Sequence, residues 1–187
     1  MIKRKWIFAV LALALCIPVL WLAVAFLSSP RSDLVGVHYT IASSLPDVEH
    51  ISAERFAGLD RDELIIFDTR EADEFAVSHL PQAIRISPDM PAEDFLAKYG
   101  DLVSGKKAVF YCSVGARSSQ YASQVQDALE TRGAEKVINL KLGLFGWHND
   151  GRAVVGEQGS ATQAIHPYDD FWGRLLERKQ HISKFPK

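Results

Sequence analysis

A cysteine followed at short range by a glycine and an arginine is the part of this sequence best suited to chemistry. Cys112 comes directly after the apolar run at residues 108–111 and shortly before a helical pattern from Ser118 to Arg132. The start of a helix offers free N–H groups and a partial positive charge, which favour the thiolate form of a cysteine. Cys112 is therefore the predicted catalytic nucleophile.

The residues after Cys112 are suited to holding an anionic group against the sulfur. Gly115 lets the loop curl so that successive backbone N–H groups point at one centre. Arg117 adds a fixed positive charge and a forked set of donors, while Ser113 and Ala116 are small enough to leave the entrance open. The predicted substrate-binding residues are Ser113, Val114, Gly115, Ala116, Arg117 and Ser118.

Asp68 and Arg70 are candidate border residues of the same pocket. Asp68 follows the apolar run at residues 64–67, and the carboxyl ends of parallel strands meet at one edge of a sheet. The alternative, which we favour, is a structural role in which Asp68 caps the following helix and Arg70 pairs with a carboxylate, because an Asp beside the thiolate would oppose its ionisation. The histidines have no metal-ligand spacing on a helix, and we favour structural or surface roles for His79 and His148.

Alternating strand and helix patterns predict the fold that positions this loop. Short apolar runs without polar alternation suit strands buried on both faces, and helical patterns lie between them. The expected strands are residues 64–67, 83–86, 108–111 and 137–140, and the expected helices 52–59, 71–79, 91–99 and 118–132. We predict an α/β domain over residues 47–156 with a central, mostly parallel sheet and helices on both faces.

The N-terminal residues predict export. Lys3, Arg4 and Lys5 precede an uncharged run over residues 6–27, long enough to cross a bilayer as one helix. We expect residues 1–28 to be a transmembrane anchor, a cleaved signal segment being the alternative. The protein is then single-pass in the cytoplasmic membrane, with its domain on the periplasmic or extracellular side.

The remaining segments are expected to be accessory. We expect residues 29–46 to form a tether. We expect residues 157–187 to form a linker followed by an amphipathic segment that packs against the domain. The chain of 187 residues is long enough for one such domain, and its net charge of -2 gives no basis for binding nucleic acid.

Three segments together resemble the single-domain rhodaneses over about residues 48–155. The loop from Cys112 to Ser118 resembles their active loop, and Leu142-Gly143-Leu144-Phe145-Gly146-Trp147 resembles their closing signature. Three segments upstream of this loop resemble the family's first signature: Asp68-Thr69-Arg70, Glu74-Phe75 and Ser78-His79-Leu80-Pro81-Gln82-Ala83-Ile84. The sequence departs from the family at Ser78, Gln82 and near Leu144, where glycine is usual.

The resemblance implies a sulfurtransferase that needs no cofactor. The Cys112 thiolate would take sulfane sulfur from thiosulfate or a persulfide, and the Cys112 persulfide would pass it to cyanide, a thiol or a partner protein. One alternative is a phosphatase that shares the rhodanese fold, whose loop needs five residues between Cys and Arg; four lie between Cys112 and Arg117. The other is a non-catalytic binding module, against which Cys112 itself argues.

Overall fold

The computed structural model describes residues 29–186 of the chain. The predicted anchor or signal segment, residues 1–28, lies outside the described residues. Among the helices of residues 29–186, none has both the length and the apolar character that a membrane crossing requires.

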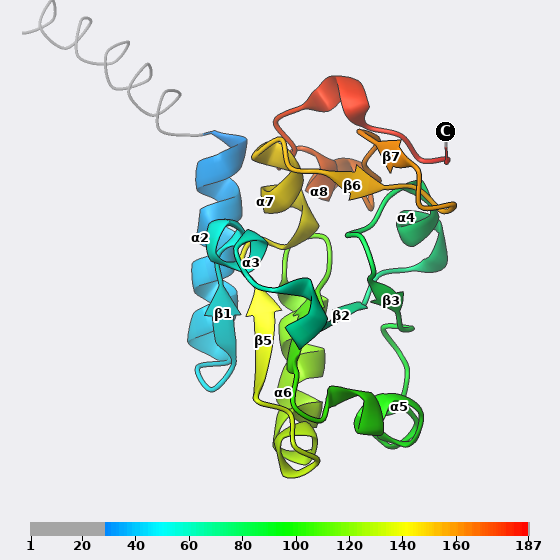
Figure 1. Ribbon diagram of the computed structural model, residues 1–187. Coiled ribbons are helices and arrows are strands. Elements are labelled where there is room, and N and C mark those ends of the chain that lie inside the picture. The colour runs from blue at the N-terminus through cyan, green and yellow to red at the C-terminus, as the bar shows by residue number, and fades with distance from the viewer. Residues whose placement is uncertain (1–28, 187) are drawn as a thin grey trace, which may run out of the picture.

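A five-stranded parallel sheet forms the centre of the molecule (Figure 1). Its order is β1-β5-β4-β2-β3, and each neighbouring pair runs parallel. The strands are β1 (Glu49–Ile51), β2 (Leu64–Asp68), β3 (Ile84–Arg85), β4 (Lys107–Tyr111) and β5 (Lys136–Leu140). The predicted parallel sheet is confirmed, and β1 is a strand that the sequence patterns did not predict.

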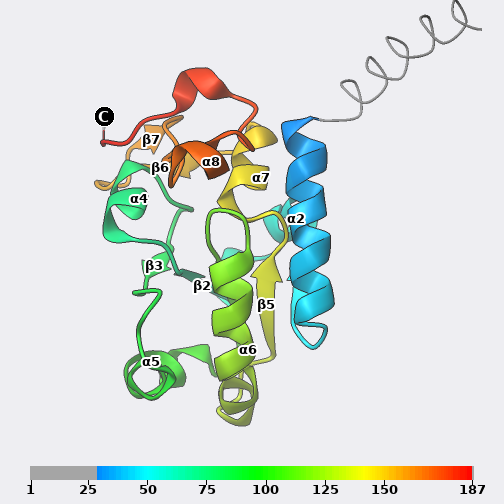
Figure 2. The ribbon, with the colours of Figure 1, turned by 180° about the vertical axis from the view of Figure 1, so that it is seen from behind.

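Helices cover both faces of this sheet, which is why its strands are apolar without alternation. Along β2, Leu64 and Ile66 belong to one core cluster, whereas Ile65 and Phe67 belong to the other. The first cluster includes residues of α3 (Ala53–Ala57) and α7 (Gly143–Asn149), and the second includes residues of α5 (Ala92–Tyr99) and α6 (Ala116–Thr131). Figures 1 and 2 show this layering from opposite sides.

The short connecting helices complete the domain. The helix α4 (Ala72–Val77) follows β2, and single turns of 3-10 helix occupy Arg61–Glu63, Gly100–Val103 and Lys179–His181.

The predicted tether at residues 29–46 is wrong, because most of it is the helix α2 (Pro30–Ser44). Ser29 caps the helix by accepting from the Ser32 N–H, and Pro30 occupies the first turn, where its missing N–H costs nothing. Leu34 and His38, four residues apart on one face, are buried, and α2 packs against α6 and α7. Helix caps and burial of this face make the segment part of the domain.

The expected linker after residue 156 is also wrong, since it forms a hairpin. The strands β6 (Val154–Val155) and β7 (Ala161–Thr162) pair antiparallel. The remaining tail, with α8 (Asp170–Gly173), buries Ile165, Leu175 and Leu176. Packing of the C-terminal segment against the domain is therefore confirmed.

Two of the departures from the family pattern have different consequences for the backbone. Ser78 is extended, with φ -169°, a conformation open to any residue. Gln82 has φ 66°, in the left-handed region that glycine occupies without strain. The chain keeps a glycine-like turn at Gln82 at a cost of about 1–2 kcal/mol.

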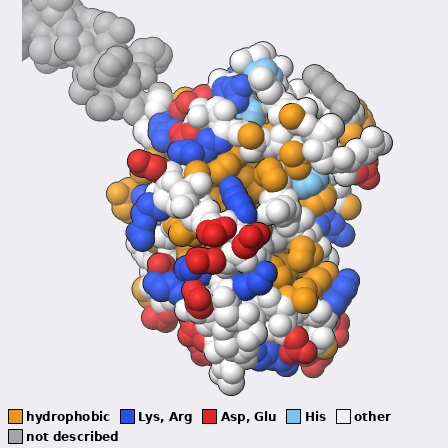
Figure 3. Space-filling model, viewed as in Figure 1, with side chains coloured by type: hydrophobic (Ala, Val, Ile, Leu, Met, Phe, Trp, Pro, Cys, Tyr) orange, Lys and Arg blue, Asp and Glu red, His pale blue; other side chains and the backbone are white. Residues whose placement is uncertain are grey.

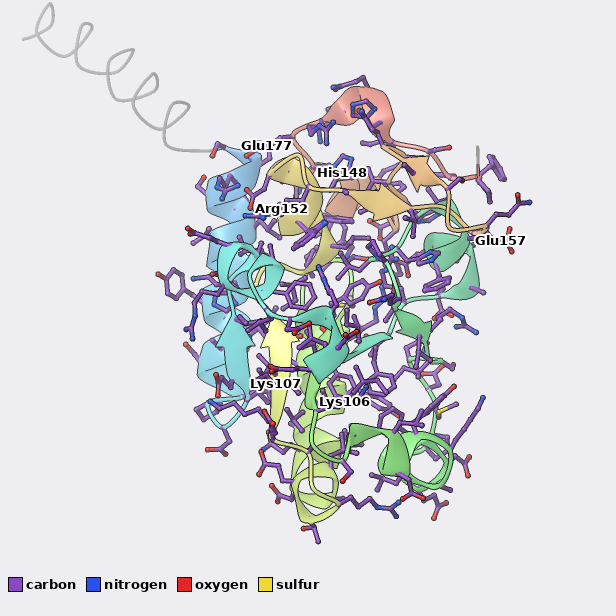
Figure 4. The ribbon with its side chains drawn as sticks, viewed as in Figure 1. Lys106, Lys107, His148, Arg152, Glu157 and Glu177 are labelled. Carbon is purple, nitrogen blue, oxygen red and sulfur yellow. The ribbon has the colours of Figure 1, made fainter. Side chains whose placement is uncertain are left out.

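Ion pairs mark the amino ends of the central strands. The Lys107 ammonium lies 3.0 Å from carboxylates of Glu63 and Glu135, and Lys136 lies 2.7 Å from Glu49. Acidic and basic side chains are intermixed on the face of the molecule seen in Figure 3. Lys107, the first residue of β4, is labelled in Figure 4. Exposed pairs of this kind contribute about 0–1 kcal/mol each, so they add little to the stability of the fold.

We predict that stability falls with acid because of His38. Burial, and then the positive charges of His50 and Lys141, lower the pKa of His38 to about 4. Between this value and the unfolded pKa of about 6.5, the unfolded chain binds more protons, so stability is complete above pH ~6.5 and is lost as pH falls toward 4. The loss should reach at most about 3.5 kcal/mol, at about 1.4 kcal/mol per pKa unit.

Urea unfolding at a series of pH values measures this slope. His38→Phe keeps the aromatic contact with His50 but cannot be protonated, so its pH dependence should be shallower. An equally steep slope in the variant would show that His38 is not responsible.

Candidate active site

Cys112 lies directly after β4, the middle strand of the sheet, and before α6. Its residue is only 1% exposed, and the Gly115 N–H donates to Sγ at 3.1 Å. Gly115 has φ 96°, a conformation that aims this N–H back at the sulfur and that side-chain-bearing residues rarely adopt. The loop predicted from Gly115 is curled, and of the successive N–H groups expected to converge, that of Gly115 is directed at Cys112 Sγ.

The first turn of α7 fixes the position of this loop through backbone hydrogen bonds. The N–H groups of Leu144 and Phe145 donate to the carbonyls of Cys112 and Ser113 at 2.8 and 2.9 Å. A Cβ on Gly143 would collide with the Cys112 carbonyl, so only glycine permits this approach. The loop carbonyls are therefore tied to α7, while the N–H of Gly115 stays directed toward Sγ.

A buried carboxylate that sequence reasoning did not place in the site contacts the loop. Glu74 of α4 is 1% exposed and accepts from the Arg117 guanidinium at 2.8 and 3.0 Å. The Glu74 carboxylate also accepts a hydrogen bond from the Ser113 hydroxyl. Glu74 belongs to the Glu-Phe part of the first signature, but nothing in its spacing indicates that it would reach Arg117, 43 residues away.

Arg117 is held in place by these contacts and by an aromatic ring. Burial lowers the pKa of Arg117, but Cys112 and Glu74 raise it by more, so the guanidinium stays charged. Its Cζ lies 5.0 Å from the centre of the Tyr168 ring, within cation–π distance.

A partly open cavity of about 140 Å³ lies over the cysteine. Its lining residues are Cys112, Ser113, Val114, Ala116, Arg117, Tyr168 and Trp172. Of the predicted substrate-binding residues, Gly115 and Ser118 are not in this lining. Gly115 acts through its N–H on Sγ, and Ser118 is buried inside the domain. Tyr168 and Trp172 come from the C-terminal segment, and no motif in the sequence pointed to them.

Asp68 and Arg70 do not line the cavity, so their candidate role as border residues is wrong. Both side chains are fully buried and form a bidentate ion pair. Arg70 Nε lies 2.9 Å from one oxygen of the Asp68 carboxylate, and Arg70 Nη2 lies 2.6 Å from the other. Arg70 also donates to the Ser78 carbonyl at 2.7 Å. The favoured structural role is confirmed for Arg70, which pairs with a carboxylate and ties the end of β2 to the chain that follows α4. Asp68 does not cap α4, whose N-cap residue is Glu71, so that part of the prediction is wrong.

The two histidines of the signature segments also have structural roles. His79 Nδ1 lies 2.9 Å from the Phe75 carbonyl and its ring stacks on Phe75. His148, labelled in Figure 4 on α7, has Nε2 2.9 Å from the Gln163 carbonyl. Burial is the main cause that lowers the pKa of each ring, so both are neutral parts of the packing. Over residues 29–186, no three His, Cys, Asp or Glu side chains converge in a way that could hold a metal ion.

Comparison with known proteins agrees with this geometry. The family model of the rhodanese-like domain matches residues 52–150, from the start of α3 to the end of α7. The chain belongs to the rhodanese-like family. The match stops before β6, so Tyr168 and Trp172 lie outside the matched part.

Individual relatives are distant. A curated protein named sulfurtransferase, from Allochromatium vinosum, is 25% identical over 100 residues, 54% of this chain and 86% of the relative. A solved thiosulfate sulfurtransferase from Pseudomonas aeruginosa aligns with a TM-score of 0.50 and 19% identity, over 71% of this chain and 24% of that one. A rhodanese-related protein from Thermoplasma volcanium covers 58% of this chain and 99% of its own, with a TM-score of 0.46 and 23% identity. At family level the rhodanese-like chain is related to sulfurtransferases.

We predict that Glu74→Gln destabilises the protein by about 2–3 kcal/mol, because it leaves the partly buried Arg117 charge without its partner. Glu157→Gln, at an exposed carboxylate on the β6–β7 hairpin (Figure 4), is the matched control and should change stability by less than about 0.5 kcal/mol. Urea unfolding measures both.

A double variant tests whether the unpaired charge of Arg117 causes the loss of stability in Glu74→Gln. Arg117→Met removes the stranded charge, so the loss in Glu74→Gln combined with Arg117→Met should be smaller than the sum of the single losses by about 1 kcal/mol or more. Strict additivity would show that the two side chains are not energetically coupled.

Proposed function

We propose that this protein is a sulfurtransferase that carries sulfane sulfur as a persulfide on Cys112. The thiolate attacks the outer sulfur of a donor such as thiosulfate, an S–S bond forms at Sγ, and the donor's own S–S bond breaks. The bonding electron pair leaves with sulfite. An acceptor such as cyanide, a thiol or a thiol-bearing partner protein then attacks the outer sulfur and restores the thiolate.

The observation that carries this proposal is the amide of Gly115 donating to Cys112 Sγ at the carboxyl edge of the sheet. A preorganised N–H directed at a sulfur stabilises negative charge there, both on the thiolate and as the charge moves to the outer sulfur. Arg117, charged and close to Cys112, adds to this stabilisation. Family membership and the relative named sulfurtransferase support the same assignment.

Phosphate-ester hydrolysis is the weaker candidate on two grounds. Only four residues separate Cys112 from Arg117, a short ring for a phosphoryl group. In addition, Arg117 is already paired with the buried Glu74, whose carboxylate would repel a phosphate dianion. A non-catalytic binding module gives no functional reason for a cysteine sulfur that accepts a hydrogen bond from a loop amide.

Cys112→Ser should abolish both persulfide formation and turnover, because the hydroxyl cannot hold the transferred sulfur. Intact-protein mass spectrometry after incubation with a sulfane-sulfur donor should show a gain of one sulfur atom in the wild type and none in the variant. Arg117→Ala should keep a reactive thiol but lose about ten- to a hundredfold in turnover, since one charge-assisted contact contributes about 1.5–3 kcal/mol.

Thiocyanate release and aryl-phosphate hydrolysis on the same three proteins provide the contrast. Full activity in Cys112→Ser would overturn the proposed function, and efficient phosphatase activity would reverse the ranking of the two chemistries.

We further propose that the domain works on the exported side of the cytoplasmic membrane, anchored through residues 6–27. The basic residues before this uncharged run support that orientation. Protease added to intact spheroplasts should degrade the domain while a cytoplasmic marker survives. Survival of the domain together with the marker would exclude this topology.

A further inference from the structure

The C-terminal strap, residues 164–176, supplies part of the wall of the Cys112 cavity. Tyr168 and Trp172 line the cavity together with the active loop, although they follow Cys112 by more than 50 residues. In both ribbon views the α8 region of the strap lies beside the loop that leads into α6 (Figures 1 and 2). One side of the cavity is therefore aromatic and lies outside the part of the chain that matches the family.

Both ends of the strap are fixed, which holds these rings in place. The Ile165 N–H donates a hydrogen bond to the His181 carbonyl, and the Ile165 carbonyl accepts one from the Ser183 N–H, both at 3.0 Å. At the other end Leu175 is buried, and its carbonyl accepts from Asn149 at 2.9 Å.

Between these fixed ends the strap is tightly folded. Asp169 caps α8 by accepting from the Trp172 N–H at 2.7 Å. Tyr168 has φ 66°, a left-handed conformation that costs a non-glycine residue free energy and that persists only where the surroundings impose it. Its ring then lies over the Arg117 guanidinium.

The fixed charges around the sulfur do not favour a dianion. Arg117 carries the positive charge that reaches the cavity, and the buried Glu74 carboxylate lies 2.8 Å from it. With the Cys112 thiolate, the three groups sum to about one negative charge. A donor with two negative charges enters such a site less readily than one with a single charge and an apolar body.

Resting on the proposed sulfurtransferase function, we infer that Tyr168 and Trp172 make this site selective for monoanionic sulfane-sulfur donors that carry an aromatic or similarly flat apolar group. The cavity of about 140 Å³ matches the roughly 150 Å³ of apolar space known to take up a benzene ring. The ring of such a donor stacks against the strap while its outer sulfur meets Sγ.

The chemistry is the same as for thiosulfate, with a different leaving group. For an organic thiosulfonate, the Cys112 thiolate forms an S–S bond with the outer sulfur, and the bond from that sulfur to the sulfonyl group breaks. The bonding pair leaves as the sulfinate, which keeps the apolar group. One thiolate and one thiosulfonate monoanion thus give one persulfide anion and one sulfinate anion.

Three donors distinguish the contributions of charge and ring. Benzenethiosulfonate, methanethiosulfonate and thiosulfate are compared at equal concentration, by single-turnover persulfide formation on Cys112 and by kcat/KM with cyanide. In the wild type, the benzene donor should exceed the methane donor by about tenfold, as expected for burial and stacking of one ring. Thiosulfate should be the slowest of the three.

Variants of the strap then assign the selectivity to its rings. Tyr168→Ala and Trp172→Leu should each lower kcat/KM for the benzene donor by about three- to tenfold more than they lower it for the methane donor. Phe171→Ala is the matched control, because Phe171 is an aromatic residue of the same strap that is 54% exposed and does not line the cavity. Melting curves confirm that each variant is folded. Of the two cavity residues, Tyr168 at 47% exposure is more exposed than Trp172 and should tolerate truncation better.

The outcomes separate this inference from the function on which it rests. If Cys112 forms a persulfide with none of the donors, the sulfurtransferase assignment fails and the inference with it. If persulfide forms but thiosulfate is fastest, or if Tyr168→Ala and Trp172→Leu slow all donors equally, the assignment stands and the inference is overturned. Loss of ring selectivity in these two variants, with Phe171→Ala unchanged, is the result that supports it.

Discussion

The site depends on close contact between the loop after β4 and the first turn of α7. Gly143 has no side chain, so the backbone of α7 reaches the Cys112 carbonyl, and two N–H groups of α7 bond the loop carbonyls. With its carbonyls fixed in that direction, the loop directs the Gly115 N–H to Sγ. A substitution at Gly143 would push the loop and helix apart, and the sulfur would lose its amide donor without any change to Cys112 itself.

A second constraint is electrostatic. The site keeps Arg117 charged and partly buried, and such a charge is costly unless it is paired. Glu74 supplies the pair from α4, a helix whose position depends on the buried Asp68–Arg70 pair at the end of β2. The buried pair that seemed a candidate for the pocket border therefore acts indirectly, by positioning the segment that carries Glu74.

Segments on either side of the rhodanese-like domain complete the molecule. α2 covers the domain through Leu34 and His38, and the C-terminal strap closes one side of the cavity with Tyr168 and Trp172. The part of the chain that matches the family supplies Cys112 and the Gly115 N–H that donates to its sulfur. The strap, which lies outside the matched part, places two aromatic side chains in the lining of the cavity over Cys112.

The sequence by itself determined the parallel sheet, the place of Cys112 between β4 and α6, and the structural role of Asp68 and Arg70. The first two features follow from short-range patterns, namely apolar runs buried on both faces and a glycine in the loop. The third follows from electrostatics, because an Asp beside the thiolate would oppose its ionisation. The tertiary structure alone decided that Glu74 meets Arg117, that Tyr168 and Trp172 enclose the cavity, and that residues 30–44 form a packed helix. Each of these depends on contacts between residues far apart in the chain, and no local spacing encodes which distant surface will bury a given side chain.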